Sequence, residues 1–568
     1  MTTPASERPA VLLLEDSPAS APPTTPEWAC SSVVVPYEPA TVAEALHRLL
    51  SDPEITSVLC WAQRLGPVPP LSVLRELLSD PGIDVAHAGL QLGLGNLPRR
   101  HQQVAPTWML SLDPPAENRG TSWRVSLEAA LIRTAVVSQV GGLDPHFDTV
   151  TGVGLEAGHR WIRSGAFVIG EPALLAHLPS SVGQGAASES PIAPEPPTDA
   201  DEIRFLLRRH GLLWAGLALV TQPRASGVWS NLRPLIAESS VATGILDRVE
   251  RPLLVSPTPG TVPLSVSVLI PTIDRAPWLR VVLDQLRCQT VTPHEVVVVD
   301  QSGDDHVDPD IAADFADLPL TYRRQFVEGQ STARNEALGL VTGDVVLFLD
   351  DDDEVEPDLI ERHLETLTNF GADVCSGVAD EPTSGELPAD FTYIRSGDVL
   401  GTNNASVRRS MLERVGGFDL AFDHGPRADL DLGIRLHLAG ARMVLDPSIR
   451  VLHHRAPRGG LRTFEARAVT RGSSRQAIFE TVPSAATELY LWHRHFGPVR
   501  RRQAERIRRL SALAGSGSRR HNAARFVVQA AKIVFGANAA SHRTATAEAA
   551  KLLAAHPTID RPLTTVSS

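Results

Sequence analysis

Four consecutive aspartates, Asp350 to Asp353, follow directly after the apolar segment 345–349. A short, uninterrupted apolar run of this kind predicts a buried strand, so the acidic residues stand at the end of that strand. Neighbouring carboxylates repel one another unless water or a cation compensates their charge. A solvated acidic loop is one interpretation, but the position at the end of a buried strand favours a cation site. Such oxygen ligands suit Mg²⁺ or Mn²⁺.

The second half of the chain alternates short apolar segments with amphipathic ones, which is the pattern of an α/β sheet. Segments 265–270 and 295–299 are predicted strands, and Asp300 follows the second of them. In open α/β sheets, ligands bind in the crevice beyond the carboxyl ends of the strands. We therefore expect Asp300 and Asp350 to face one crevice, and two carboxylates so placed indicate a binding site better than either one alone.

At 568 residues the chain is too long for one ordinary core, so we expect several domains. Stretches rich in Pro, Ser, Thr and Ala without periodicity predict a disordered lead and a linker. The expected divisions are a disordered lead (1–27), a first α/β domain (28–179), a linker (180–199), a helical connector (200–260), a catalytic α/β domain (261–460) and a basic helical C-terminal region (461–568).

The cysteines and the apolar stretches indicate the cellular compartment of the protein. Cys30, Cys60, Cys288 and Cys375 show neither metal-ligand spacing nor a paired framework. The longest apolar stretch, 212–220, has about half the length needed to cross a bilayer. The first residues lack the basic and apolar regions of a secretory signal. These observations predict a cytoplasmic protein with reduced cysteines.

Several motifs follow one another through the second α/β region. They read V-S-V-L-I-P-T-I-D, V-V-V-V-D-Q-S-G-D-D, G-Q-S-T-A-R-N-E-A-L, G-D-V-V-L-F-L-D-D-D-D, G-G-F-D-L-A-F, A-D-L-D-L-G-I-R-L-H-L-A-G and V-L-H-H. In this order they resemble glycosyltransferase family 2 over residues 264–455. The resemblance implies a GT-A type, Rossmann-like mixed α/β sheet for this region.

The resemblance also implies an activity. It implies the inverting, metal-dependent transfer of a hexosyl or deoxyhexosyl group from a nucleoside-diphosphate sugar to an acceptor hydroxyl, with Mg²⁺ or Mn²⁺ as cofactor. The acceptor could be a glycan, a lipid-linked molecule or a small molecule. Carried over by position, the donor contacts are Thr272, Asp274, Asp300, Arg334, Asp350 and Asp351. Within this set, Asp300 is expected to bind the base and Arg334 the ribose or diphosphate.

The metal ligands and the general base follow from the same resemblance. Asp350 and Asp352 match the D-x-D motif of the family. His453 matches a histidine that completes the metal or diphosphate site, with His454 as a close rival. Asp429 matches the general base that takes the acceptor proton, whereas the ordinary interpretation of this residue is a surface position on a helix.

Two positions depart from the family pattern. Ala428 precedes the expected base where the family usually has an acid, and Gln301 replaces the acid that usually follows Asp300. The first departure bears on acceptor orientation and the second on the choice of nucleotide.

Two other functions are worth weighing. A sugar nucleotidyltransferase would need a glycine-rich phosphate loop after the first strand, and residues 271–274 do not form one. A non-catalytic carbohydrate-binding or scaffolding protein is the remaining alternative, and the retained acidic residues argue against it.

The first α/β region repeats parts of the second. Residues 138–147 (S-Q-V-G-G-L-D-P-H-F) parallel residues 413–422 (E-R-V-G-G-F-D-L-A-F). Residues 154–165 parallel residues 429–440 in the same way. The parallel predicts a degenerate copy of the same fold, with chance resemblance of a short segment as the alternative.

This first copy lacks the residues of the expected site. Gln63, Arg64 and Leu65 stand where the aspartates stand, and Gly154 stands where Asp429 stands. The strand that carries Asp300 has no counterpart in this alignment. We therefore expect a truncated, inactive copy that pairs with the active one and shapes the acceptor cleft or an oligomer contact, and not an independent second enzyme.

The C-terminal region is strongly basic. The whole chain has a net charge of −13, whereas residues 455–568 contain 20 Lys or Arg against 6 Asp or Glu. Arginines gather at 500–502 and 506–509 in a predicted helix. A solvated arginine-rich face is the favoured interpretation. The alternative is contact with anionic lipid at the inner face of a membrane or with a phosphate-bearing acceptor. Nucleic-acid binding is not expected, because no recognisable module is present.

Overall fold

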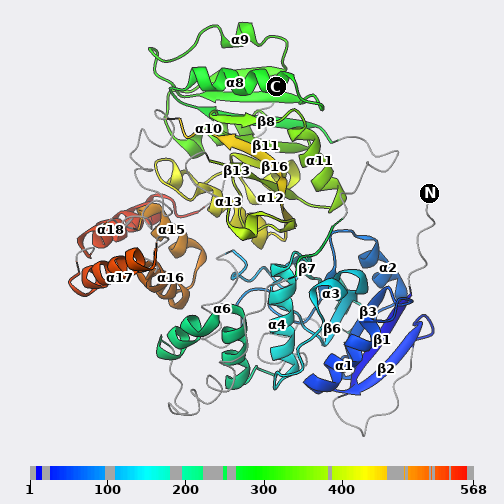
Figure 1. The fold of residues 1–568 in the computed structure, drawn as a ribbon. Coiled ribbons are helices and arrows are strands. Elements are labelled where there is room, and N and C mark those ends of the chain that lie inside the picture. The colour runs from blue at the N-terminus through cyan, green and yellow to red at the C-terminus, as the bar shows by residue number, and fades with distance from the viewer. Residues whose placement is uncertain are drawn as a thin grey trace.

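The computed structural model describes residues 8–15, 26–95, 97, 109–179, 195–221, 247–251, 264–381, 387–456, 479, 484–510, 513, 518–536 and 539–558. Within them the chain forms two mixed α/β sheets, one above the other in Figure 1, with a group of C-terminal helices beside them. This arrangement confirms the predicted fold class of an α/β protein with a helical C-terminal region.

The N-terminal sheet has seven strands in the order β2-β1-β3-β6-β4-β7-β5. They are β1 (Pro9–Glu15), β2 (Ser31–Pro36), β3 (Ser57–Ala62), β4 (Val85–His87), β5 (Gly120–Thr121), β6 (Ala129–Arg133) and β7 (Val168–Gly170). The accompanying helices are α1 (Pro39–Leu50), α2 (Leu71–Ser79), α3 (Thr134–Val140) and α4 (Val150–Arg163). Their apolar sides and the sheet share one hydrophobic core.

Strand β1 lies inside the stretch 1–27, for which composition predicts disorder, and that prediction is wrong for residues 9–15. β1 pairs in parallel with both β2 and β3, and its apolar side chains are buried. The run from Ala10 to Leu14 is continuously apolar, as expected for a parallel strand that is covered on both faces. The Pro, Ser and Thr residues around this short run conceal it in the averaged composition.

The second sheet has nine strands in the order β10-β9-β8-β11-β15-β13-β16-β12, with β14 paired to β16. They are β8 (Val266–Thr272), β9 (Glu295–Asp300), β10 (Leu320–Arg324), β11 (Val345–Leu349), β12 (Asp353–Val355), β13 (Val374–Asp380), β14 (Arg395–Ser396), β15 (Asn404–Arg408) and β16 (Met443–His453). The helices are α8 (Ala276–Arg287), α9 (Ile311–Asp314), α10 (Gln330–Leu338), α11 (Leu359–Asn369), α12 (Arg409–Val415) and α13 (Ala428–Leu438). Strands β8, β9 and β11 confirm the three strands predicted from the sequence.

The two sheets share one topology. The order β2-β1-β3-β6-β4-β7 corresponds to β9-β8-β11-β15-β13-β16, with the same parallel and antiparallel pairings. At equivalent points the backbone N–H of Phe167 donates to Asp84 at 2.7 Å and that of Arg442 donates to Asp373 at 2.9 Å. Because β2 takes the place of β9, the prediction that the strand bearing Asp300 has no counterpart is wrong.

Further helices lie beside the sheets. They are α6 (Asp199–Thr221), which is kinked at Gly211, and α15 (Ala486–His495), α16 (Pro498–Leu510), α17 (Arg519–Val534) and α18 (Ala539–Ala555). Among the described helices, none is both long and apolar enough to cross a membrane. The expected linker 180–199 lies mostly outside the described residues.

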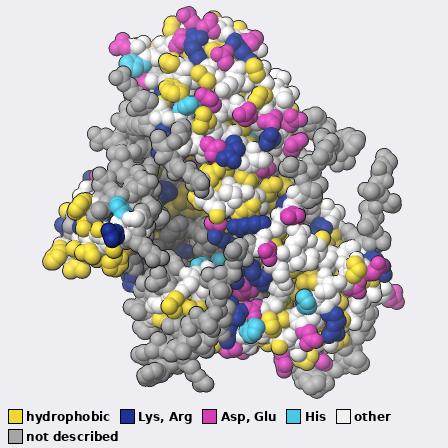
Figure 2. Space-filling view, viewed as in Figure 1, with side chains coloured by type: hydrophobic (Ala, Val, Ile, Leu, Met, Phe, Trp, Pro, Cys, Tyr) yellow, Lys and Arg dark blue, Asp and Glu magenta, His cyan; other side chains and the backbone are white. Residues whose placement is uncertain are grey.

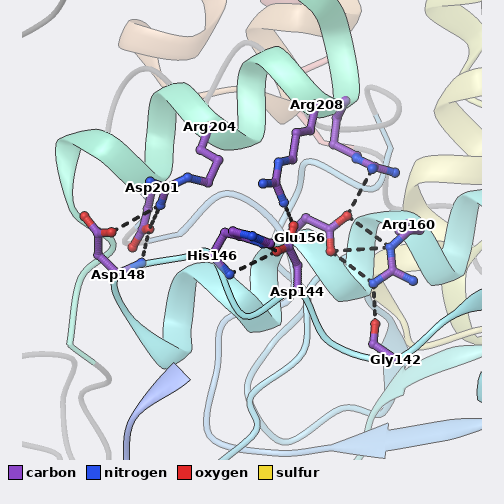
Figure 3. A network of polar contacts seen from close by, with 10 residues as sticks. Gly142, Asp144, His146, Asp148, Glu156, Arg160, Asp201, Arg204 and Arg208 are labelled. Atoms are coloured by element: carbon purple, nitrogen blue, oxygen red, sulfur yellow. Dashed lines mark hydrogen bonds and ion pairs between the residues drawn. The ribbon is translucent and has the colours of Figure 1, made fainter. Parts of the chain in front are cut away.

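The helix that follows each sheet is held by equivalent polar contacts. Figure 3 shows four residues of this network in the N-terminal unit: Asp144, Glu156, Arg160 and Arg208. Their counterparts in the second unit are Asp419, Asp431, Arg435 and Arg494. Helices α6 and α15 are therefore part of the correspondence between the two units.

Candidate active site

The acidic run lies where β11 ends, between β8 and β16, and two arginines face it. Thr272 Oγ1 donates to Asp351 at 2.7 Å. Arg275 contacts Asp351 at 2.8 Å and Asp352 at 3.1 Å, and Arg334 contacts Asp350 at 3.1 Å. These contacts place Thr272 and Arg334, two of the predicted donor residues, at the aspartates. Arg275 is a site residue that sequence reasoning missed, although it directly follows the predicted Asp274.

Three side chains offer a ligand set for a cation. Asp350, Asp352 and His453 each present a ligand atom, and these atoms all lie within 4.8 Å of one another. Strand β16 brings the histidine to this place, because Asp353 in β12 pairs with His453. This is the metal set predicted from the sequence, and its carboxylate and imidazole donors suit a divalent cation.

The structure separates the two candidate histidines. His453 is buried, and its Nδ1 lies 2.9 Å from Asp353 and 3.7 Å from Asp352. His454 instead contacts Glu354 at 2.6 Å, and its ring lies 4.9 Å from that of Trp278. The predicted residue, His453, is therefore the one that joins the aspartates.

Burial makes negative charge costly at this site. It raises the pKa of Asp351 to about 6, against the opposing effect of Arg275. Burial likewise raises the pKa of Asp353 to about 7, with His453 opposing the shift. For His453, burial disfavours the charged ring, but the hydrogen bond to Asp353 and the nearby carboxylates outweigh it and raise the pKa to about 9. The raised pKa values of the two acids show that Arg275 and His453 compensate their charge only in part.

The predicted base-binding residues lie at the ends of β8 and β9. Asp300 is buried, and its carboxylate accepts hydrogen bonds from the Ser302 backbone at 2.7 Å and from the hydroxyl of Tyr322. The backbone of Asp274, in the left-handed region at φ 56°, donates to Ser302 Oγ at 2.7 Å. Both acids thus shape the loop that follows β9, so part of the role of Asp300 is to hold that loop.

Gln301, which departs from the family pattern, fastens a second loop. Its side-chain N–H donates to the Val327 carbonyl at 2.7 Å, and its side-chain oxygen accepts from Gly329 N–H at 3.1 Å. Phe326 at the tip of this loop is 83% exposed. An aspartate could not donate the bond to the Val327 carbonyl, so the glutamine holds this loop in a way that an acid could not.

Asp429 and Asp431 differ sharply in their surroundings. Asp431 is fully buried and binds Arg435 at 2.9 Å and His495 at 2.7 Å. Burial alone would raise the pKa of Asp431, but Arg435 and His495 outweigh it and lower that pKa. Asp429 is half-buried in the first turn of α13 and accepts a hydrogen bond from the adjacent Leu430 N–H at 2.8 Å. Of the two acids, Asp429 is the one with an accessible side chain that has no ion-pair partner among the described residues.

The N-terminal unit supports the helix that carries Asp429. Met109 and Leu112 are buried in the core of the second unit, near Gly433 of α13. Asn118 Nδ2 donates to the Leu438 carbonyl at 3.2 Å, at the end of this helix. Helix α13 therefore rests on a segment from the other half of the chain.

An ion pair joins the two units just beyond α13. Arg442 binds both oxygens of Asp80 at 2.6 Å. Burial would raise the pKa of Asp80, but Arg442 outweighs it and lowers that pKa. We expect Arg442→Met to lower the free energy of unfolding by about 3 kcal/mol, because it leaves a partly buried carboxylate with only the more distant Arg119, at 3.5 Å. Urea denaturation followed by tryptophan fluorescence would measure the loss.

The matched control is a surface pair of the same kind. Arg450 binds Asp380 at 2.7 Å, with both side chains more than a third exposed. Arg450→Met should therefore cost less than about 1 kcal/mol. Equal losses in the two variants would show that the contact between the units adds nothing to stability.

Residues 267–426 match the sequence model of the family described as glycosyl transferase family 2. This part of the chain is a family 2 glycosyltransferase domain. The putative glycosyltransferase EpsH of Bacillus subtilis (strain 168) is 28% identical over 171 residues, which are 26% of this chain and 48% of that protein. The pre-mycofactocin glycosyltransferase of Mycobacterium tuberculosis (strain CDC 1551 / Oshkosh) is 29% identical over 256 residues, which are 41% of this chain and 52% of that protein.

Among solved structures, the mannosyltransferase PcManGT from Pyrobaculum calidifontis aligns with 22% sequence identity and a TM-score of 0.31. That alignment covers 55% of this chain and 80% of the other. The chain spans about half the length of EpsH and of the pre-mycofactocin glycosyltransferase. The glycosyltransferase domain shared with these relatives includes the aspartate run, whereas Asp429 and His453 lie just beyond the residues that the family model matches.

Proposed function

We propose that this chain transfers a sugar from a nucleoside-diphosphate sugar to an acceptor hydroxyl, with inversion at the anomeric carbon and with Mg²⁺ or Mn²⁺ bound. The observation that carries this proposal is the convergence of Asp350, Asp352 and His453 within 4.8 Å at the end of β11. A family 2 glycosyltransferase domain with hard ligands at this edge of its sheet is suited to hold a diphosphate through a divalent cation.

Each residue around the site then has a role. A bound divalent cation supplies charge neutralisation for the departing nucleoside diphosphate. Arg334 and Arg275 hold the carboxylates in place, and both guanidinium groups add positive charge beside the diphosphate. Thr272 fixes Asp351 at the floor of the crevice.

The reaction itself needs a base on the acceptor side. Asp429 takes the proton from the acceptor hydroxyl as that oxygen attacks the anomeric carbon and the bond to the diphosphate breaks. Such general base catalysis contributes about 10²–10⁴-fold. One displacement from the face opposite the leaving group inverts the anomeric centre.

The nucleoside would lie over the ends of β8 and β9. Asp274 and Asp300 shape the loop that begins at Gln301, and Gln301 holds the neighbouring loop that ends at Gly329. These two loops form the edge of the crevice nearest the base. Their hydrogen bonds hold the two loops in place, which supports nucleotide selection by a pre-formed surface. Asp300 contributes to this surface through the loop that it holds and through its own carboxylate.

We also infer that the N-terminal unit is a degenerate, non-catalytic copy of the glycosyltransferase domain. By strand register, Ala62, Gln63, Arg64 and Leu65 take the places of the four aspartates. The guanidinium of Arg64 forms an ion pair with Glu128 and lies over the ring of Tyr37 at 5.0 Å. A fixed positive charge therefore stands where the active unit would bind a metal.

Ligand-linked stabilisation tests the proposed donor site. Nucleoside diphosphates and nucleotide sugars should raise the melting temperature in the presence of Mn²⁺, since a ligand at a hundred times its Kd adds about 2.7 kcal/mol to the folded state. A thermal-shift panel over the common nucleotides would identify the donor. The shift should disappear with a chelator, and no shift with any nucleotide would contradict the proposal.

A pair of variants makes this test specific to the site. Asp350→Asn should lose the nucleotide-dependent shift that requires Mn²⁺. Asp284→Asn, an exposed acid on α8 that pairs with Arg287 at 2.8 Å, should keep it. Retention of the full shift by Asp350→Asn would place the metal elsewhere.

A further inference from the structure

Helix α17 turns its apolar side outward. The exposed fractions are 53%, 67%, 78% and 84% for Phe526, Val527, Val534 and the adjoining Phe535. On the opposite side of the helix, Arg525 and Gln529 are each only 1% exposed. A surface helix of a globular protein normally buries its apolar stripe and exposes its polar one.

The exposed apolar residues form one continuous patch. At 3.6 residues per turn, Val527, Ala531 and Val534 follow one line along the helix, with Phe526 and Phe535 on its two flanks. We call these five residues the outer face of α17. Figure 2 shows hydrophobic side chains gathered at the edge of the molecule where α17 and α18 lie in Figure 1.

A further aromatic residue lies beside this face. The ammonium group of Lys532 in α17 donates to the backbone carbonyl of Phe479, which places that residue next to the helix. The side chain of Phe479 is 69% exposed. An apolar patch of this kind on one helix marks a surface that contacts another phase or another molecule.

The charge of the segment that carries the outer face indicates what kind of surface binds there. Residues 518–555 contain six Lys or Arg and a single acid, Glu548, so this segment carries a charge of +5. Arg520, Arg543 and Lys551 are exposed. Exposed apolar side chains with an exposed cation on the same helix and two on the next helix match the interface of an anionic bilayer, where acyl chains lie below negative head groups. A second copy of the chain would instead bring an equal positive charge against this one.

We propose that the outer face of α17 docks on the surface of an anionic lipid bilayer. The helix lies in the plane of the interface, with Val527 and Val534 toward the acyl chains. Arg520 and neighbouring basic residues contact the lipid phosphates. This surface is distinct from the proposed donor site, and the proposal does not depend on the transferase activity.

The sequence pointed to the arginines of α16 for the membrane alternative, but three of them make contacts within the protein or are buried, whereas Arg502 and Arg506 are exposed. Arg508 binds Glu488 at 3.2 Å, and Arg501 lies 2.9 Å from the ring of His493. Burial lowers the pKa of Arg500 to about 10, with Asp113 opposing the shift. Helix α17, and not α16, therefore presents the surface that combines apolar area with charge.

Vesicle sedimentation with the full chain tests the proposal. The protein should sediment with vesicles of phosphatidylcholine mixed with phosphatidylglycerol and remain in the supernatant with phosphatidylcholine alone. Added salt should weaken binding, because each basic residue near the surface contributes about fivefold to affinity at low ionic strength. Equal binding to both kinds of vesicle, or binding to neither, would overturn the proposal.

Two substitutions locate the contact. The double variant Val527→Glu, Val534→Glu should bind anionic vesicles about 100-fold more weakly, since each change removes about tenfold of apolar binding. Val281→Glu, at an exposed apolar position on α8, is the matched control and should bind as the wild type does. Unchanged circular dichroism and melting temperature would show that the double variant folds.

Two results would overturn the assignment of this surface. One is full vesicle binding by the double variant. The other is a dimer of the wild type, seen by analytical ultracentrifugation, that the double variant does not form, because the outer face would then pair with a second copy of the chain.

Discussion

Asp352→Ala is expected to reduce metal-dependent sugar transfer or donor hydrolysis by about 10³-fold, because the cation supplies several kcal/mol of charge stabilisation in the transition state. Asp352 is one of the three predicted metal ligands. Its side chain is nearly fully buried, it contacts Arg275, and its second oxygen accepts a hydrogen bond from Ala456 N–H at 2.6 Å. Release of the nucleoside diphosphate from the donor found by the thermal-shift panel would measure the loss.

A surface aspartate provides the matched control for this variant. Asp317 forms an exposed pair with Arg287 at 2.6 Å, so Asp317→Ala should leave turnover unchanged. Melting temperatures of both variants would separate a lost site from a lost fold. Unchanged turnover in a folded Asp352→Ala protein would refute the metal site, and equal loss in the control would show that the assay reports stability instead.

Asp429→Asn is expected to lower kcat by about 10²–10⁴-fold while the donor still binds, because the amide cannot accept the acceptor proton. The donor-dependent thermal shift should be retained, since Asp429 lies on α13 and outside the carboxylate cluster at the end of β11. A loss of kcat without a loss of donor binding is the signature of a base. A fall in donor affinity of similar size would assign Asp429 to the donor pocket.

The neighbouring acid on α13 gives the contrasting result. Asp431→Asn removes the charged partner of Arg435 and His495, so it should lower the free energy of unfolding by about 3 kcal/mol. The folded fraction of this variant should retain its kcat. If Asp431→Asn lowers kcat in the folded protein as much as Asp429→Asn does, then the roles of the two acids must be exchanged.

The central strands of the second sheet could be predicted from local sequence because they are short and continuously apolar. Strands β9 and β11 end within one residue of the predicted positions and β8 runs two residues further, to Thr272. In parallel strands the residues after these ends share one edge. The contact of Thr272, at the end of β8, with Asp351 follows from that rule, whereas Arg334 reaches Asp350 from helix α10. The resemblance to glycosyltransferase family 2 then pointed to Asp429 and His453, whose roles remain predictions for the variants above.

Features that depend on pairings between distant segments could not be predicted from local sequence. The antiparallel pairing of β12 with β16 brings His453 to Asp353 across 100 residues, and no local pattern indicates it. Strand β1 is concealed because a single apolar run among Pro and Ser residues resembles a disordered stretch until β2 and β3 flank it. The part played by Gln301 depends on where the loop ending at Gly329 lies.

The burial of Met109 and Leu112 in the core of the second unit has a consequence for synthesis. The first unit leaves the ribosome well before the ribosome has made residues 428–442, which contact the segment with Met109 and Leu112. During that interval the two side chains lack the core in which they pack, and Asp80 lacks Arg442 and has only the more distant Arg119 of its own unit, at 3.5 Å. The nascent chain therefore presents an apolar surface that can aggregate. The first half must therefore remain competent for docking until translation of the second half is complete, so that correct folding depends on the order in which the two halves are synthesised.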